Sequence, residues 1–151
     1  MCLQLYVAAS EPIDPPYDPA VGELGGIVRL PEAKAGELRA FTKPYVYQIL
    51  FRNSCACECA RPGSPLRRAL VGLLEWALRS VPEVQLYTCQ QDDEGSEPNL
   101  WDWCMPTELL YLREFKGREF LVIPRDTEPS APDDGAAHGP SVSNATRRPR
   151  I

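Results

Sequence analysis

Histidine is almost absent from this chain, which has a single one, His138, among its 151 residues. Hydrolase arrangements of the cysteine–histidine or serine–histidine–aspartate kind need an imidazole as general base, so residues 1–125 cannot build them. Histidine-rich metal sites are excluded from the same residues. Sulfur is therefore the only soft metal ligand that this part of the chain offers.

Other familiar patterns are missing as well. The stretch "GELGG" at residues 22–26 lacks both the spacing of a phosphate-binding loop and a following Lys-Ser/Thr pair. No Cys-x-x-Cys pair of the thioredoxin-like kind occurs. The acidic run "QDDEG" at residues 91–95 lacks the ligand ladder of a calcium loop. We therefore expect no catalytic residues, and the balance favours a protein that is not an enzyme.

Long apolar runs are also absent. No stretch approaches the roughly 20 apolar residues that span a bilayer, and "MCLQLYVAAS" at the N-terminus does not have the pattern of a signal peptide. The predicted location is the cytoplasm, where the six cysteines would be reduced. The net charge of −5 argues against nucleic acid and membranes as partners, because both are bound through a basic face. A protein partner is compatible with this composition.

The rest of the composition predicts one α/β domain over residues 1–125, with α+β as the alternative class. Hydrophobic residues make up 44% of the chain and charged residues 25%, a usual globular mixture. Residues 126–151 contain almost no core-forming side chain and are predicted to be a disordered tail. We expect a mixed sheet of four to five strands, at residues 3–9, 27–30, 45–51, 83–89 and 119–123, with helices at 32–40, 64–80 and 106–113.

The helix predicted at 64–80 is the best defined of these elements. Ser64 and Pro65 supply an N-cap hydroxyl and a proline at the first helical position. An apolar stripe at helical spacing follows, and four charged residues fall mostly outside it: Arg67, Arg68, Glu75 and Arg79.

Four short blocks carry a resemblance to a known family: "MCLQLYVAAS", "FTKPYVYQILFRNSCACEC", "EVQLYTC" and "REFLVIPR". Together they resemble a family of small uncharacterised bacterial proteins, which begin with a Met-Cys strand and carry a Lys-Pro strand followed by a Cys-x-Cys element. The resemblance covers about residues 1–125 and implies a single domain, without a mechanism. This chain departs from the family pattern by a third cysteine, Cys59, so no ligand set is carried over.

The stretch "SCACECARPGSP" at residues 54–65 carries most of the functional information, because it places Cys55, Cys57 and Cys59 at alternate positions. In a regular strand such neighbours lie roughly 6.5–7 Å apart, too far for two sulfurs bound ~2.3 Å from one zinc ion. Chelation therefore needs a turn at Ala56 or Glu58. Zinc and copper(I) both suit thiolate ligands, so the cofactor stays open between them.

The topology predicts which other cysteines meet this run. Strands 45–51 and 83–89, with a helix between them, have the lengths of a β-α-β crossover, whose two strands run parallel. Parallel strands end at the same edge of a sheet, so Cys89 is the predicted fourth sulfur of the metal site. Cys104 can return to this edge through the following loop. Cys2 joins it only if the first strand runs antiparallel to strand 45–51.

Three other interpretations of these residues stay open. Thiols before a helix start can act as redox-responsive groups, because the helix dipole favours thiolate. The cysteines can also be buried and pack as small apolar side chains. In a third interpretation the protein is an interaction module without chemistry, in which an aromatic loop with Trp101 and Trp103 joins the proline-rich segment 12–19 to form the binding surface.

Overall fold

Six strands of the chain form one mixed sheet in the computed structural model, which describes residues 2–13, 24–52 and 55–125. The strand order is β2-β3-β1-β4-β6-β5. The strands are β1 Leu3–Ala9, β2 Leu24–Arg29, β3 Tyr45–Phe51, β4 Glu83–Gln90, β5 Leu100–Trp103 and β6 Glu119–Pro124. The helices are α1 Glu32–Ala35, α2 Pro65–Ala77 and α3 Pro106–Tyr111, with a 3₁₀ helix, η2, at Ala56–Ala60. The predicted tail, 126–151, lies outside the described residues.

The mixed α and β content is confirmed, and the predicted strand number of four to five is wrong. The additional strand is β5, which the sequence analysis assigned to an aromatic loop. Its four residues pair in parallel with β6, with Trp101 opposite Phe120. So short a strand owes its conformation to this long-range pairing and leaves little local signal in the sequence. The predicted helix at 32–40 is also shorter than expected, because α1 ends at Ala35 before Gly36.

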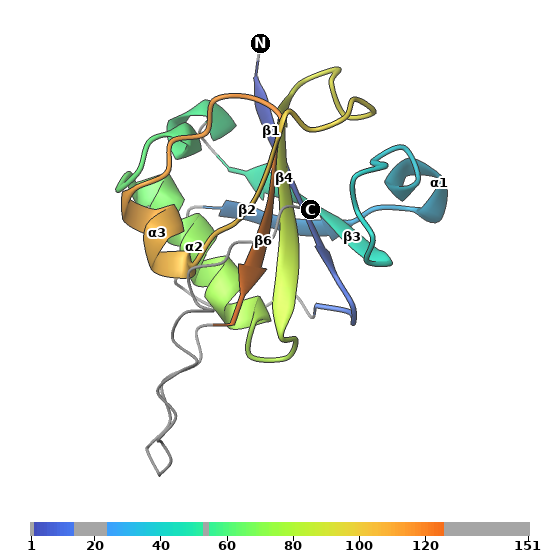
Figure 1. Cartoon of the computed structure of the whole chain (residues 1–151), viewed down its shortest axis with the longest axis horizontal. Coiled ribbons are helices and arrows are strands. Elements are labelled where there is room, and N and C mark those ends of the chain that lie inside the picture. The colour runs from blue at the N-terminus through green and yellow to red at the C-terminus, as the bar shows by residue number, and fades with distance from the viewer. Residues whose placement is uncertain (1, 14–23, 53–54, 126–151) are drawn as a thin grey trace, which may run out of the picture.

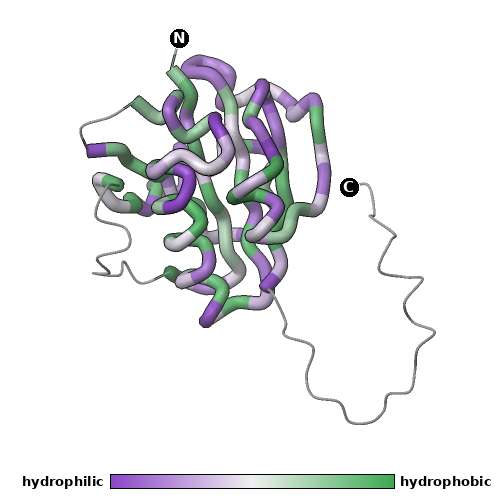
Figure 2. The backbone as a smooth tube through the Cα atoms, turned by 90° about the vertical axis from the view of Figure 1, so that its left-hand side faces the viewer, coloured by the Kyte–Doolittle hydropathy of each residue, from purple (hydrophilic) through white to green (hydrophobic). Residues whose placement is uncertain are grey.

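The two faces of the sheet are covered differently (Figure 1). One face packs against α2, α3 and η2 and holds the larger apolar cluster, which includes Leu5, Leu70 and Leu86. The other face is covered by the segment around α1, through Leu38 and Phe41. Figure 2 faces the helical layer and shows apolar and polar positions alternating along its turns. The periodicity predicted for this layer is therefore present in the fold.

Strand direction decides what lies at each end of the sheet. Both β3 and β4 pair antiparallel with β1, which lies between them, so β3 and β4 run parallel to each other. The predicted parallel relation is thus confirmed, although the two strands are not neighbours. The start of β1 consequently lies at the same end of the sheet as the ends of β3 and β4 (Figure 1).

Helix α2 begins as the sequence predicts. The backbone N–H of Arg67 donates to the hydroxyl of Ser64 at 3.1 Å, and Pro65 occupies the first turn. Leu66, Leu70 and Leu74 are buried against the sheet. Burying a leucine side chain fully is worth about 1.5–3 kcal/mol, so this stripe fixes the helix on the sheet.

Arg67 lies off the apolar stripe of α2, yet its side chain is completely buried. The guanidinium donates to the carbonyls of Cys59 at 2.7 Å and Ala60 at 2.8 Å, at the end of η2. It also donates to the carbonyls of Leu109 and Arg113, and it stacks 3.9 Å from the ring centre of Phe115. One side chain thereby joins η2, α2, α3 and the segment after α3.

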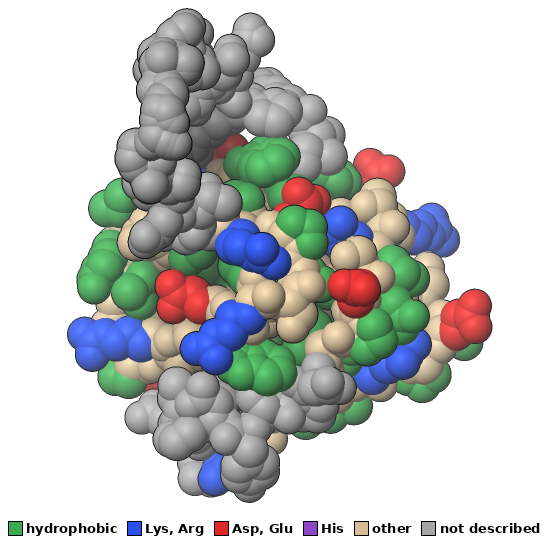
Figure 3. Space-filling model, turned by 90° about the horizontal axis from the view of Figure 1, so that it is seen from below, with side chains coloured by type: hydrophobic (Ala, Val, Ile, Leu, Met, Phe, Trp, Pro, Cys, Tyr) green, Lys and Arg blue, Asp and Glu red, His purple; other side chains and the backbone are tan. Residues whose placement is uncertain are grey.

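The surface of the described residues gives two further findings. No helix within them is long and apolar enough to cross a membrane. The face in Figure 3 carries acidic and basic side chains interspersed with apolar ones, without a region of one sign.

We predict that Arg67→Met destabilises the fold by about 3–5 kcal/mol, because the carbonyls that the guanidinium satisfies would be left buried without a donor. Urea unfolding measures this change. The matched control is Arg68→Met, whose exposed neighbouring side chain should change stability by about 0.5 kcal/mol or less. Equal effects of the two substitutions would contradict the role assigned to Arg67.

Candidate metal centre

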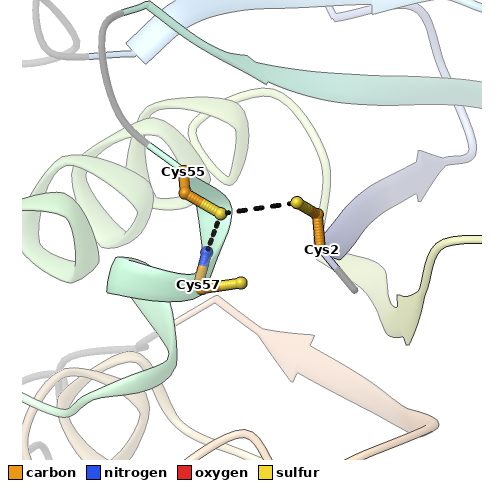
Figure 4. A group of neighbouring side chains, drawn as sticks. All are labelled: Cys2, Cys55 and Cys57. Carbon is orange, nitrogen blue, oxygen red and sulfur yellow. Dashed lines mark hydrogen bonds between the residues drawn. The ribbon is translucent and has the colours of Figure 1, made fainter.

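Three thiols from two distant segments meet at the end of the sheet where β1 begins. The sulfurs of Cys2, Cys55 and Cys57 all lie within 4.8 Å of one another. The Sγ atoms of Cys2 and Cys55 are 3.8 Å apart (Figure 4). None of the three forms a disulfide within the described residues, and all three are exposed. This is the only group of three or more potential metal-ligating side chains found within the described part of the chain.

The 3₁₀ helix η2 supplies the turn that chelation requires. Cys55 caps this helix: its sulfur accepts the N–H of Cys57 at 3.4 Å, and its carbonyl accepts the N–H of Glu58 at 3.0 Å. A 3₁₀ helix has three residues per turn, so side chains two positions apart point to different sides. Cys57 and Cys59 therefore point to different sides, with Cys57 exposed and Cys59 buried in the core. Cys55 precedes the helix with extended backbone and is exposed as well.

The antiparallel direction of β1 brings Cys2 to this turn. The N–H of Leu3 donates to the sulfur of Cys57 at 3.4 Å, across 54 positions of sequence. The carbonyl of Cys2 accepts the N–H of Gln91, after β4, at 2.9 Å. Cys2 is thus held by its backbone on one side and meets the 55–57 turn on the other. Cys2 was expected to join the cysteine run only if β1 is antiparallel to β3, and β1 has that direction.

The two backbone N–H groups that point at these sulfurs, from Leu3 and Cys57, are donors of the kind that a metal-bound thiolate accepts. Cys55 and Cys57 each accept one backbone N–H, and such donors stabilise a charged acceptor more than a neutral one. Cys57 also borders a surface hollow of about 490 Å³, together with Glu58, Arg61 and Ser64. The thiols therefore combine solvent access with fixed donors from the backbone.

Two of the predicted ligands lie elsewhere. Cys59 is buried in the helix-side core beside Arg67, and burial raises the pKa of its thiol to about 11 although Arg67 opposes the shift. Cys89 lies at the predicted end of the sheet but packs on the opposite face. Its pKa is raised to about 12 by burial first and by Glu94 and Asp93 second. The structure brings Cys55 and Cys57 together with Cys2, and not with Cys59 or Cys89.

The remaining candidates fall outside the cluster. Cys104 is buried, and burial followed by the charge of Glu108 raises its pKa to about 11. Trp101 and Trp103 are half-buried on β5, and the Trp101 ring packs 4.7 Å from the ring of Phe120. The proline-rich segment 12–19 lies outside the described residues beyond position 13. Neither tryptophan is fully covered, so both remain accessible in part.

Comparison with known proteins adds no relative: no family model, no curated protein and no solved structure matches the chain. The resemblance to small bacterial proteins is therefore still an expectation from the sequence. The chemistry of the site must be argued from its own geometry.

We predict that three thiols react rapidly with a disulfide reagent in the folded protein and six in denaturant, because three cysteines are exposed and three are buried. At pH 8 a thiol with a pKa of about 11 is thiolate in about one molecule in a thousand, which further slows Cys59 and Cys104. Six rapid thiols in the folded protein would contradict the burial described.

The same pKa shifts predict how stability changes in alkali. The folded state keeps the protons of Cys59, Cys89 and Cys104 at pH values where the unfolded chain loses them, above about 8.5. The unfolded state then binds fewer protons, so the free energy of unfolding falls as pH rises from about 8.5 toward 11–12. Cys89→Ala, followed by urea unfolding across this range, should reduce the slope.

Proposed function

We propose that this protein binds a soft metal ion through the thiolates of Cys2, Cys55 and Cys57. The observation that carries the proposal is the convergence of three exposed sulfurs from two segments of the chain. Two sulfurs bound at ~2.3 Å from one ion with a tetrahedral angle lie about 3.8 Å apart. The separation of the Cys2 and Cys55 sulfurs, 3.8 Å, matches that value without movement of the backbone.

The backbone around the thiols supports the same function. Metal-bound thiolates carry charge that needs nearby donors, and the N–H groups of Leu3 and Cys57 already point at sulfur. Solvent exposure of all three cysteines gives an ion an entry path. Thiols that are reduced at rest are needed for binding, which is why we propose the cytoplasm as the location.

The test is to purify the protein without added metal or chelating tag and to count metal and free thiols together. We predict one thiophilic ion per chain, with three thiols becoming reactive when the ion is removed. Cys55→Ser should lower the affinity by more than about 100-fold, because even the loss of an outer-shell partner costs 10–100-fold.

The matched control is Cys59→Ala, which removes a cysteine of the same run whose thiol is buried beside Arg67. Metal content should be unchanged in this variant if it remains folded by circular dichroism. The proposed ligand set would be overturned if Cys59→Ala lost metal binding while Cys55→Ser kept it.

Reversible oxidation is a second candidate function, favoured by the 3.8 Å approach of the exposed sulfurs of Cys2 and Cys55. With a peroxide as oxidant, one thiolate attacks an oxygen of hydrogen peroxide and becomes a sulfenic acid while hydroxide leaves. The second thiol then attacks that sulfur, forming the disulfide and releasing water. The two thiols are oxidised by two electrons, which the peroxide takes up.

We predict that mild peroxide treatment of the metal-free protein forms a Cys2–Cys55 disulfide that dithiothreitol reverses. Peptide mapping identifies the pair, and Cys57→Ser should leave its formation intact. Bound metal should protect both thiols. A disulfide that instead includes Cys89 or Cys104 would contradict the assignment.

A further inference from the structure

The number of sulfurs that meet at the site limits which ion it can hold. The group contains Cys2, Cys55 and Cys57, and no fourth sulfur, carboxylate or imidazole belongs to it among the described residues. A structural zinc site is almost always four-coordinate, with protein ligands at every position. Three thiolates alone therefore cannot form a closed structural zinc site, and a zinc ion bound here would need water as its fourth ligand.

Cys59 and Cys89, the two predicted ligands that lie outside the cluster, cannot complete a four-sulfur site without unfolding part of the core. Cys59 is completely buried, and its own carbonyl is held by the Arg67 guanidinium at 2.7 Å, which fixes η2 in its present orientation. Cys89 is completely buried on the opposite face of the sheet. Recruiting either residue would expose apolar side chains or break the contacts of Arg67.

Oxygen ligands are also poorly placed. Glu58 follows Cys57 directly and is exposed, yet its carboxylate oxygens fall outside the group of atoms within 4.8 Å. Oxygen is a hard ligand, which zinc accepts and soft ions avoid. The site thus offers three soft donors of one kind on an exposed surface.

We infer that the site selects a three-coordinate thiophilic centre, copper(I) or trivalent arsenic, over zinc(II). This inference rests on the proposed function and narrows it to a class of ion. Copper(I) is soft and accepts a trigonal set of three thiolates, and trivalent arsenic binds three thiolates in a pyramid. Copper(I) binding releases three protons from the three thiols. Arsenite, As(OH)₃, exchanges its three hydroxyls for the three thiols and releases three waters, without any change of oxidation state.

The experiment titrates the reduced full-length protein without oxygen, in separate arms, with copper(I), arsenite and zinc(II). The copper and zinc arms each contain a chromogenic chelator as competitor. We expect one copper(I) or one arsenic per chain with three sulfur neighbours by X-ray absorption. Each single substitution, Cys2→Ser, Cys55→Ser or Cys57→Ser, should lower that affinity by more than about 100-fold. For each ion, the affinity of the protein is divided by the affinity of a small dithiol in the same buffer. We expect this ratio to be lower for zinc(II) than for copper(I).

The three titrations distinguish a failure of this inference from a failure of the proposed function. If no ion binds in any arm, the metal-binding function itself is overturned. If zinc binds while copper(I) and arsenite do not, only the selection inferred here is overturned. The selection would also be overturned if the cobalt(II)-loaded protein had an absorption spectrum typical of four thiolates and the Cys59→Ala variant lost that spectrum. Binding of either copper(I) or arsenite through three sulfurs supports it, and comparison of the two arms identifies the ion.

Discussion

The buried guanidinium of Arg67 is the interaction on which the arrangement of this site depends. It satisfies carbonyls from two segments that are far apart in sequence, the end of η2 and the end of α3 with the residues after it. The cysteine run has little apolar surface with which to hold itself against the sheet. Because its last carbonyls are tied to α2 through Arg67, the turn from Cys55 to Cys57 keeps a defined direction.

Among the described residues no carboxylate forms an ion pair with the buried Arg67, so its burial carries a desolvation cost. Here the cost is offset by carbonyl acceptors and by the face of the Phe115 ring, 3.9 Å away. An apolar side chain could fill the same volume but could not orient four carbonyl groups. We regard Arg67 as a residue that fixes one arrangement of η2 and α3, and the position of the exposed thiols follows from that arrangement. Gly63 assists by its positive φ of 76°, which turns the chain so that its N–H reaches the carbonyl of Leu110.

The sequence predicted which end of the sheet would hold the site, and it did so from chain direction. Strand–helix–strand lengths implied that β3 and β4 run parallel, and the dependence of Cys2 on the direction of β1 was stated in advance. Alternation along β4 puts Cys89 on the face opposite to Val84 and Leu86, but long-range packing alone determines which of the two faces η2 covers. The burial of Arg67 was not predicted, because an apolar stripe identifies buried positions by hydrophobicity and does not detect a polar group that is buried with its hydrogen bonds satisfied.

The central place of β1 in the sheet has a consequence for the order in which the protein assembles. β1 comes first in the chain, yet it lies between β3 and β4 in the sheet. The residues of β3 and β4 that pair with β1 follow it by about 40 and 80 positions in sequence. Until β4 has formed, the first strand has only one of its two neighbours, and the backbone contact between Cys2 and Gln91 cannot exist. The hydrogen bond from Gln91 to Cys2 therefore depends on β4, whereas the contact between Leu3 and Cys57 depends only on β1 and η2. An ion held by these thiols would cross-link the first strand of the chain to the turn before η2, two segments that lie about 54 positions apart in sequence.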